Sequence, residues 1–317
     1  MEEGDKVLII DNRYKIDNEK DEDLQIDKLY RAKDLQLDSD VYIKVIRDNT
    51  TIKDTFIANL VDESMMMSNI DCDNVANILD VITDESKYYI VSEYFNGISL
   101  FDLVNKNNIT LDNIIFIMKQ MVTSMSIFDE KGFYHGGIRL DNILVDENHN
   151  IKIYDLGITK ANGGVNIRMN DNISFLSPHQ LNINYTDIES DFFAIGVVMY
   201  YCLFKKMPFK IAKTEFDMLK NIDKGINLDP EKITIFNEPV IKIIKKLLDR
   251  KDKYNNYNEI LIDLTKIMYV KADIVENKDI DLEEVYYEEP KKDNSFMVKL
   301  VSIIMCIIIL IMIIMQL

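Results

Sequence analysis

The stretch at 135–157 constrains the fold most. It reads HGGIRLDNILVDENHNIKIYDLG, with Asn142 before an apolar alternation and Asp155 after it. The alternation predicts two short strands joined by a turn at 147–150. Such a hairpin brings Asn142 and Asp155, at its two ends, close together. Amide and carboxylate oxygens are ligands that Mg²⁺ prefers, so the stretch predicts a magnesium site beside phosphate groups.

The chain is strongly acidic. Its 317 residues carry a net charge of −17 at pH 7, which argues against nucleic-acid binding because nucleic acids favour basic surfaces. The simplest role of such a charge is solubility. Cys72, Cys202 and Cys306 are scattered and form no Cys-x-x-Cys pair, which favours a reduced, cytosolic main domain. The N-terminus is acidic and lacks a long apolar run, so we expect no signal peptide.

The C-terminal segment predicts a membrane anchor. Residues 300–317 carry no charge and are just long enough to span a bilayer as a helix, which we expect over 296–317. Lysines directly before it place the preceding domain in the cytosol, so we expect a single-pass protein of the cell membrane. The alternative is a buried core helix, although soluble helices are rarely apolar on all sides. The acidic residues 271–295 predict a juxtamembrane linker.

The remaining sequence predicts an α+β chain. Two runs, at 41–46 and 88–94, have strand character, and 52–70 has helical periodicity. Helices are expected further along at 111–131, 195–204, 238–249 and 257–269. The order is therefore a small sheet with one helix, followed by a helical lobe that contains the hairpin.

Several residues follow one another in the order of the protein-kinase signature. Lys44 lies on a predicted strand, Glu63 lies on the helix that follows, and His135, Asn142 and Asp155 match H-R-D-L-x-x-x-N and D-F-G. YYIVSEYFNG is similar to the kinase hinge, and SPHQL stands where the activation segment ends. Over roughly 14–269 the chain resembles the bacterial eukaryote-like (Hanks-type) Ser/Thr protein kinases that have one transmembrane helix.

The resemblance implies a bilobal fold with a role for each matching residue. The small β-rich N-lobe would cover 14–94 and the helical C-lobe 95–270, before the linker and the transmembrane helix. Lys44 would hold the ATP phosphates and Glu63 would orient it. Ser92 stands at the gatekeeper position of the nucleotide pocket, and Glu93 follows it. Asn142 and Asp155 would bind Mg²⁺.

The catalytic loop departs from the family pattern. The aspartate that accepts the substrate proton is replaced by Gly137, and the arginine before it by Gly136. Loss of a general base typically lowers a rate by ~10²–10⁴-fold. Arg139 replaces the loop lysine and keeps its charge, and His135 is retained. Asp141 is the nearby carboxylate that a displaced base would use.

The glycine-rich loop is also missing. Its glycine positions fall on Glu22, Leu24 and Asp27. Glycines are needed there so that backbone N–H groups can approach phosphates. Two unit charges ~4 Å apart interact by roughly 4 kcal/mol at an effective dielectric constant near 20. The acidic residues therefore disfavour a triphosphate, and we expect ATP and Mg²⁺ to bind weakly or not at all.

Three further substitutions bear on the scaffold. Tyr42 replaces the small residue that lies over adenine, so its ring fills part of the base pocket or points outward. His179 replaces the glutamate of the A-P-E motif, and Lys253 replaces its arginine partner. Since both members of that buried pair have changed, we expect this contact to be replaced by other contacts and the scaffold to be kept.

Three functions follow from these features. The first is a membrane-anchored pseudokinase that acts as a signalling or scaffold module through a cytosolic or membrane protein partner. The second is an active but atypical Ser/Thr protein kinase. The third is a structural subunit of a membrane secretion or division complex. The sequence leaves enzymatic activity undecided.

Overall fold

The computed structural model describes most of the chain up to Glu276. The described residues are 8–16, 24–25, 27–48, 50–84, 87–106, 109–168, 172–228, 230–234 and 237–276. The expected transmembrane helix at 296–317 and most of the expected linker lie outside them. Within the described part of the chain, no helix is both long and apolar enough to cross a membrane. The chain divides into two units, Met1–Lys271 and Ala272–Leu317, and the fold and site below belong to the first.

The N-terminal lobe is a six-stranded antiparallel sheet with a helix, as expected from its strand-prone runs. The strand order is β1-β2-β3-β4-β6-β5. The strands are β1 (Ile9–Ile10), β2 (Tyr14–Ile16), β3 (Leu29–Asp34), β4 (Ser39–Arg47), β5 (Ile78–Asp84) and β6 (Lys87–Glu93). Helix α1 (Phe56–Met67) connects β4 to β5 and is shorter than the expected helix at 52–70. It packs through Phe56 and Leu60, which are buried.

The C-terminal lobe is helical with a small second sheet. That sheet consists of β7 (Ile98–Ser99), β8 (Ile143–Val145) and β9 (Ile151–Ile153), and the last two form the hairpin expected from the sequence. The helices are α2 (Leu100–Lys106), α3 (Leu111–Asp129), α4 (Ile158–Ala161), α5 (Pro178–Ile183), α6 (Ile188–Phe204), α7 (Glu215–Asp223), α8 (Glu238–Leu248) and α9 (Tyr257–Glu276). Because α9 continues to Glu276, the first residues of the expected linker are helical.

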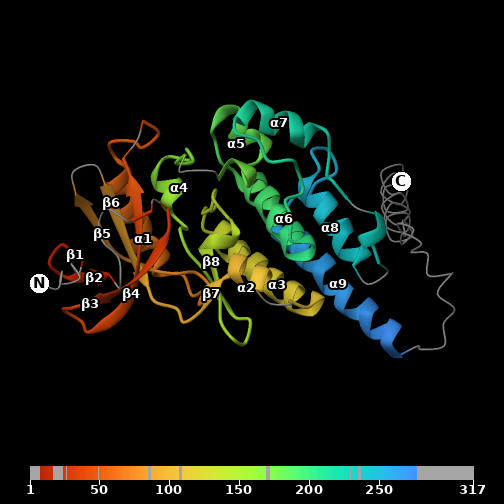
Figure 1. The fold of residues 1–317 in the computed structure, drawn as a ribbon, viewed down its shortest axis with the longest axis horizontal. Helices are drawn as coiled ribbons and strands as arrows, with labels where there is room; N and C mark the ends of the chain where they lie inside the picture. Colours follow the sequence, from red (N-terminus) through yellow and green to blue (C-terminus); the bar gives the residue numbers. More distant parts are fainter. Residues whose placement is uncertain are drawn as a thin grey trace, which may run out of the picture. The chain divides into compact units, whose positions relative to one another are not determined.

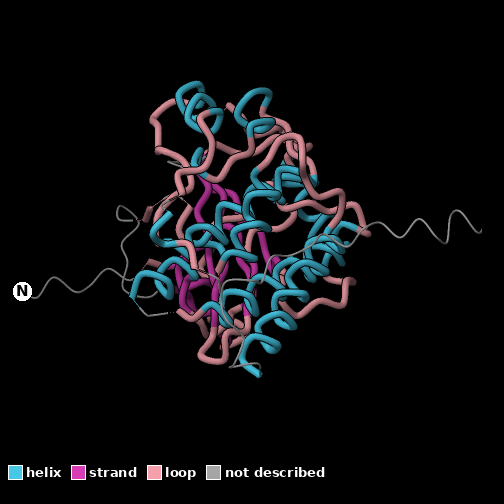
Figure 2. The backbone as a smooth tube through the Cα atoms, turned by 90° about the vertical axis from the view of Figure 1, so that its right-hand side faces the viewer, coloured by secondary structure: helices cyan, strands magenta, loops and turns pink. Residues whose placement is uncertain are grey.

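The two lobes lie side by side, with the six-stranded sheet and α1 at one end of Figure 1 and most of the helices at the other. Seen from the helical end, the helices stand in front of the strands (Figure 2). This arrangement is the bilobal fold that the resemblance predicts. The hairpin β8–β9 lies where the lobes meet, because Val75 of the N-terminal part bridges to Ile153 of β9.

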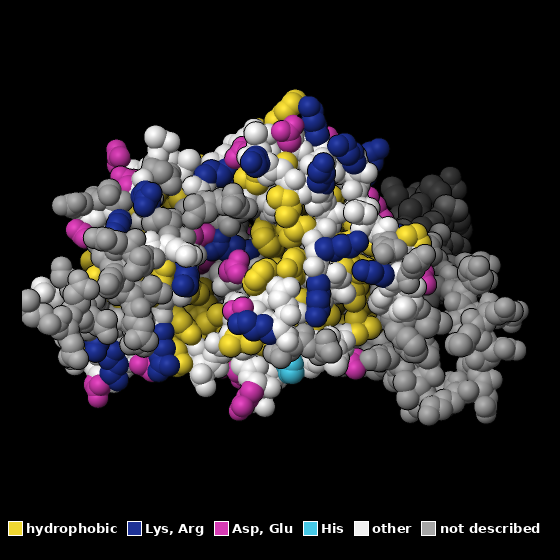
Figure 3. All heavy atoms as spheres, in the orientation of Figure 1, with side chains coloured by type: hydrophobic (Ala, Val, Ile, Leu, Met, Phe, Trp, Pro, Cys, Tyr) yellow, Lys and Arg dark blue, Asp and Glu magenta, His cyan; other side chains and the backbone are white. Residues whose placement is uncertain are grey.

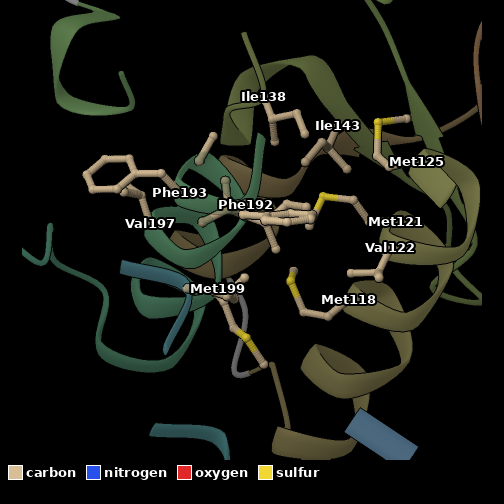
Figure 4. Close-up of a cluster of buried hydrophobic side chains, with 14 of the residues drawn as sticks. Met118, Met121, Val122, Met125, Ile138, Ile143, Phe192, Phe193, Val197 and Met199 are labelled. Atoms are coloured by element: carbon tan, nitrogen blue, oxygen red, sulfur yellow. The ribbon is translucent and has the colours of Figure 1, made fainter. Parts of the chain in front are cut away.

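Helices α3 and α6 form the centre of the C-terminal core. Both are buried on most sides, so their apolar residues are not confined to one stripe. Met118 and Met121 of α3 lie beside Phe192 and Met199 of α6 (Figure 4). The unbranched methionine side chain fills irregular gaps in such a core. This packing fixes α6, which in turn holds the loop at 135–142.

Candidate functional site

Asp191 of α6 holds the loop at 135–142 in place through hydrogen bonds to the loop backbone. The Asp191 carboxylate accepts backbone hydrogen bonds from His135 and Gly136, both at 2.7 Å. The His135 ring is fully buried, and burial lowers its pKa. Its Nε2 donates to the Tyr154 carbonyl at 2.8 Å, while Nδ1 accepts from the Gly137 N–H at 3.2 Å. His135 is therefore a neutral structural residue that ties the loop to the hairpin.

Gly136 is required by its surroundings. Its φ of +71° lies in the left-handed region, and an added Cβ would come within 2.7 Å of the methyl carbons of Thr159 and Thr186. Its carbonyl accepts hydrogen bonds from Asn166 and Gln180. A side chain such as the family's arginine does not fit here. Thr159 and Thr186 occupy the space that the Cβ of such a side chain would need.

Gly137, at the position of the general base, has free space in front of it. An added Cβ would have no neighbour closer than 3.8 Å. The adjoining cavity measures about 40 Å³ and is lined by Asp27, Lys44, Gly137 and Asp155 among others. Pockets for nucleotide-sized ligands usually measure ~300–1,000 Å³, so this cavity has room for water and not for a triphosphate.

Lys44 is paired with two aspartates and not with Glu63. Its Nζ lies 2.5 Å from Asp155 Oδ2 and 2.6 Å from Asp27 Oδ1, and its side chain is 3% exposed. Glu63 instead lies 3.1 Å from Lys160 Nζ. The expected Lys44–Glu63 pair is therefore wrong for this structure. The reason is helix α4, which packs against α1 and brings Lys160 to Glu63.

Asp27 stands where the family has the third glycine of its loop. Its φ is +70°, in the left-handed region, which aspartate tolerates better than most residues. Its carboxylate pairs with both Lys44 and Arg139, and Arg139 also donates to the Asp27 carbonyl at 3.0 Å. Burial opposes the charge of Asp27, but the two cations outweigh burial and lower its pKa to about 2. Asp27 thus neutralises the cations that face the cavity.

The other two glycine positions of the missing glycine-rich loop fall on Leu24 and Glu22. Leu24 packs against the apolar core of the N-terminal sheet, as a glycine could not. Glu22 lies outside the described residues. The sequence predicts that acidic residues of this loop repel phosphates. In the structure, Asp27 of this loop pairs directly with Lys44, the lysine that would hold the phosphates.

Asn142 and Asp155 come together, as the hairpin predicts. However, Asn142 Oδ1 accepts the Arg139 N–H at 3.0 Å, and Nδ2 donates to the Gly137 carbonyl at 2.9 Å and to Asp155 Oδ2 at 3.1 Å. The two side chains are thus hydrogen-bonded to each other, and Lys44 occupies the same Asp155 oxygen. No group of three or more His, Cys, Asp or Glu side chains among the described residues is arranged to hold a metal. Mg²⁺ does not fit between these side chains as they stand.

Tyrosine rings occupy the part of the site where the resemblance places the adenine base. The Tyr42 ring stacks on Tyr94 with centroids 5.2 Å apart and meets Tyr154 edge-on at 5.6 Å. The Tyr154 hydroxyl donates to the Glu93 carbonyl at 2.9 Å. Of the two orientations considered for Tyr42, the structure has the inward one. The hinge carbonyl is thus occupied by a side chain of the protein.

Further apolar residues complete this cluster. Leu29 of β3 and Leu144 of β8 pack with Tyr42 and Tyr154 from the two lobes. Ser92 is buried on β6 opposite Tyr42, and the Glu93 carboxylate pairs with Lys152 at 2.5 Å. Ser92 and Glu93 therefore lie at the expected hinge, but their contacts are with the protein itself.

Asp141 does not join the site. Its side chain is exposed and does not line the cavity at Gly137. Partial desolvation by the surrounding protein raises its pKa. Its position gives no support to the displaced-base hypothesis. Sequence reasoning also missed Tyr154 and Lys160, although the place of Tyr154 directly before Asp155 was a signal that its ring lies at the site.

Comparison with known proteins agrees with this architecture. The protein kinase domain family matches residues 26–255. The probable serine/threonine-protein kinase PknB of Lactococcus lactis is 29% identical, over 74% of this chain and 39% of its own length. The serine/threonine-protein kinase PrkC of Bacillus subtilis is 30% identical, over 57% of this chain and 29% of its own length.

A probable serine/threonine-protein kinase of Clostridium acetobutylicum is 28% identical, over 84% of this chain and 42% of its own length. The chain thus spans about two fifths or less of the length of these relatives. The family in general uses ATP and Mg²⁺. With the signature residues in order, the bilobal fold in place and most of the chain matched, this protein belongs to the protein kinase domain family.

Proposed function

We propose that this chain is a pseudokinase, a kinase-like signalling or scaffold module that binds a protein partner without transferring phosphate. The observation that carries the proposal is Asp27, whose carboxylate bridges Lys44 and Arg139 in the place where cations of the family meet phosphates. A nucleotide would have to displace that carboxylate. The lowered pKa of Asp27 corresponds to about 2.4 kcal/mol of stabilisation by the two cations, which nucleotide binding would have to offset.

Two further features support the proposal independently of Asp27. Gly137 offers no group that could take a proton from a substrate hydroxyl. The Tyr42–Tyr94–Tyr154 cluster and the hydrogen bond to the Glu93 carbonyl occupy the base side of the pocket. The positions that would hold the adenine base, hold the phosphates and accept the substrate proton are thus all changed. Restoring one of them alone is therefore not expected to restore activity.

One observation favours the second candidate, an atypical active kinase. Asp155 lies within hydrogen-bond distance of both Lys44 and Asn142. These residues also stabilise the junction of the lobes, which explains their contacts without catalysis.

Nucleotide binding tests the proposal. Thermal unfolding of the full chain would be followed with ATP up to 5 mM, with and without Mg²⁺. A ligand at 100 times its Kd stabilises a protein by ~2.7 kcal/mol, which corresponds to a rise of ~5–10 °C in Tm for a domain of this size. We expect no rise. Phosphate transfer to the chain or to a general protein substrate that disappears in Asp155→Ala would overturn the proposal in favour of the atypical kinase.

We propose further that residues 296–317 anchor the protein in the cell membrane, with the kinase-like domain in the cytosol. The proposal rests on the uncharged run at 300–317 and the lysines before it. Membrane fractionation tests it. The full chain should pellet with membranes and resist carbonate extraction, whereas a chain ending at Ser295 should not. Recovery of the full chain in the soluble fraction would refute the anchor.

A further inference from the structure

Helix α1 leaves an apolar side open to solvent. Val61 is 37% exposed, Met65 is 62% exposed and Met66 is 52% exposed. Ala58, three residues before Val61, is exposed as well. Because side chains three or four residues apart are neighbours on a helix, Ala58, Val61 and Met65 form one stripe about two turns long. Exposed apolar residues gathered on one surface mark interaction sites.

This stripe is not needed to hold α1 in place. The helix is anchored on its other sides by Phe56 and Leu60, which are buried, and by Glu63, which pairs with Lys160 of α4. A helix that only covers a core needs one apolar side, whereas α1 has a second one that faces solvent. The second side is therefore available to another molecule.

The chain around this stripe is acidic. Residues 48–86 contain nine Asp and Glu against one cation, Lys53. Asp62 lies on the helix beside Val61, and Asp71 and Asp73 follow the helix; all three are exposed. None of these three carboxylates forms an ion pair with a described residue. Unpaired carboxylates beside an apolar stripe favour a cationic ligand.

The cations near α1 lie on the side that faces α4. Lys160 pairs with Glu63 and also lies over the Phe133 ring, 3.7 Å from its centroid. The Lys53 side chain extends over Gly163, just after α4. Strand β5, which also packs against α1, contains neither Lys nor Arg. The carboxylates beside the stripe are thus not neutralised by these neighbouring elements.

The C-terminal lobe differs in its charges. Residues 205–253 contain thirteen Lys and Arg against eight Asp and Glu, and Figure 3 shows Lys and Arg side chains gathered over α7 and α8. A hollow of about 480 Å³ in this lobe is bordered by charges that are already paired. His179 Nδ1 lies 3.0 Å from Asp187 Oδ2, and Lys253 pairs with Glu189, in place of the buried pair of the A-P-E motif. A cationic ligand is therefore attracted to the side of α1 and not to this lobe.

We propose that the outward side of α1, from Ala58 to Met66, docks a basic amphipathic helix of a partner protein. The apolar residues of that helix would pack on Val61, Met65 and Met66, because the flexible methionine side chain adapts to the shape of a ligand. Its Lys and Arg residues would face Asp62 and the carboxylates that follow α1. Ala58 has the smallest side chain of the stripe, so it lets a partner helix approach closely.

This inference rests on the proposed function and deepens it, since it gives the protein partner a chemistry and a surface on this chain. The two can fail separately. Phosphate transfer that disappears in Asp155→Ala would refute the pseudokinase role, whereas the peptide measurements below refute only the docking surface.

Fluorescence polarisation with a labelled helical peptide tests the docking surface. The probe is an eighteen-residue peptide with Leu at every third or fourth position and Lys between them. The protein is the full chain in phosphatidylcholine nanodiscs, with empty nanodiscs as the blank. We expect binding that weakens as KCl rises from 50 to 300 mM, because salt screens exposed charges. A peptide with Glu in place of Lys, and one with the same residues in scrambled order, should bind at least about 10-fold more weakly.

Variants locate the binding on α1. Met65→Gln keeps the length and helix propensity of the side chain, and Asp62→Lys reverses an unpaired charge, so each should weaken peptide binding about 10-fold. Both side chains are exposed, and the Tm should stay within about 2 °C of wild type. The matched controls are Leu37→Gln in the turn after β3, where Leu37 is 69% exposed, and Glu147→Lys in the exposed β8–β9 turn. These should change binding less than about twofold.

Three outcomes would overturn the proposal. The first is no binding of the basic peptide, and the second is equal weakening by the control variants. The third is a dimer of the full chain that Met65→Gln converts to a monomer while the peptide stays unbound, which would assign this side of α1 to a second copy of the chain.

Discussion

Replacing Asp27 by asparagine tests how the site is held together. Asparagine has almost the same shape and tolerates the positive φ of +70°, so Asp27→Asn removes the charge and little else. We expect it to destabilise the folded protein at pH 7, because Lys44 and Arg139 lose the anion between them.

The size of the effect follows from the pKa of Asp27. Its pKa is lowered from 3.8 to about 2 in the folded protein. The difference corresponds to about 2.4 kcal/mol of stability at pH 7. This is less than the ~3–5 kcal/mol typical of breaking a buried pair, because Lys44 keeps Asp155 as a second partner. The expected fall in Tm is roughly 5–10 °C.

The pH dependence has a definite sign. A carboxyl group whose pKa is lowered on folding stabilises the protein above its unfolded pKa and loses that contribution as pH falls through its folded pKa. The difference between wild type and Asp27→Asn should therefore stay constant from pH 7 to 5. It should fall to about 1.3 kcal/mol at pH 3 and continue to shrink toward pH 2.

Urea unfolding at each pH measures this difference. Asp38→Asn is the matched control, since Asp38 also has a positive φ, of +52°, and pairs with Lys33 at 2.9 Å, but its side chain is 92% exposed. An exposed pair contributes ~0–1 kcal/mol. The reasoning is refuted if Asp27→Asn costs no more than Asp38→Asn at pH 7, or if its cost is undiminished at pH 3.

Four further substitutions probe the same site. Gly136→Ala should destabilise the protein by more than about 2 kcal/mol in urea unfolding, because of its positive φ and the threonine contacts, and a neutral result would contradict this. Gly137→Asp should fold with a Tm close to wild type, since its Cβ has space, yet show no phosphotransfer from ATP; measurable turnover would show that the base alone was missing. Tyr154→Phe should lower the stability by about 0.5–1.5 kcal/mol in thermal unfolding through loss of the bond to the Glu93 carbonyl, and an unchanged Tm would argue against that bond. Glu63→Gln should cost less than about 1 kcal/mol because its pair with Lys160 is partly exposed, and a larger loss would indicate a different partner for Glu63.

Local sequence predicted the elements well where their periodicity was strong. The hairpin between Asn142 and Asp155 forms as expected, and α3 ends within two residues of its predicted end. The helix at 52–70 was predicted too long at both ends, since α1 covers Phe56–Met67. Helix α9 continues past 269 because apolar periodicity marks a helix but does not mark its last turn.

The sequence by itself determined the family and the chemical losses. The order of Lys44, His135, Asn142 and Asp155 is legible without coordinates, and so is the absence of a side chain at Gly137. Such statements concern which residue stands at which place in a signature, and no packing can change them.

The tertiary structure decided which groups meet. Lys44 could have paired with Glu63, which lies nineteen residues later. Because α4 packs against α1, Glu63 pairs with Lys160 instead. Lys44 pairs instead with Asp155 and with Asp27, which lies seventeen residues before it. Ion pairs between distant segments depend on how the lobes and loops pack. Residue spacing along the chain reports only which pairs are within reach, and the geometry of packing selects among them.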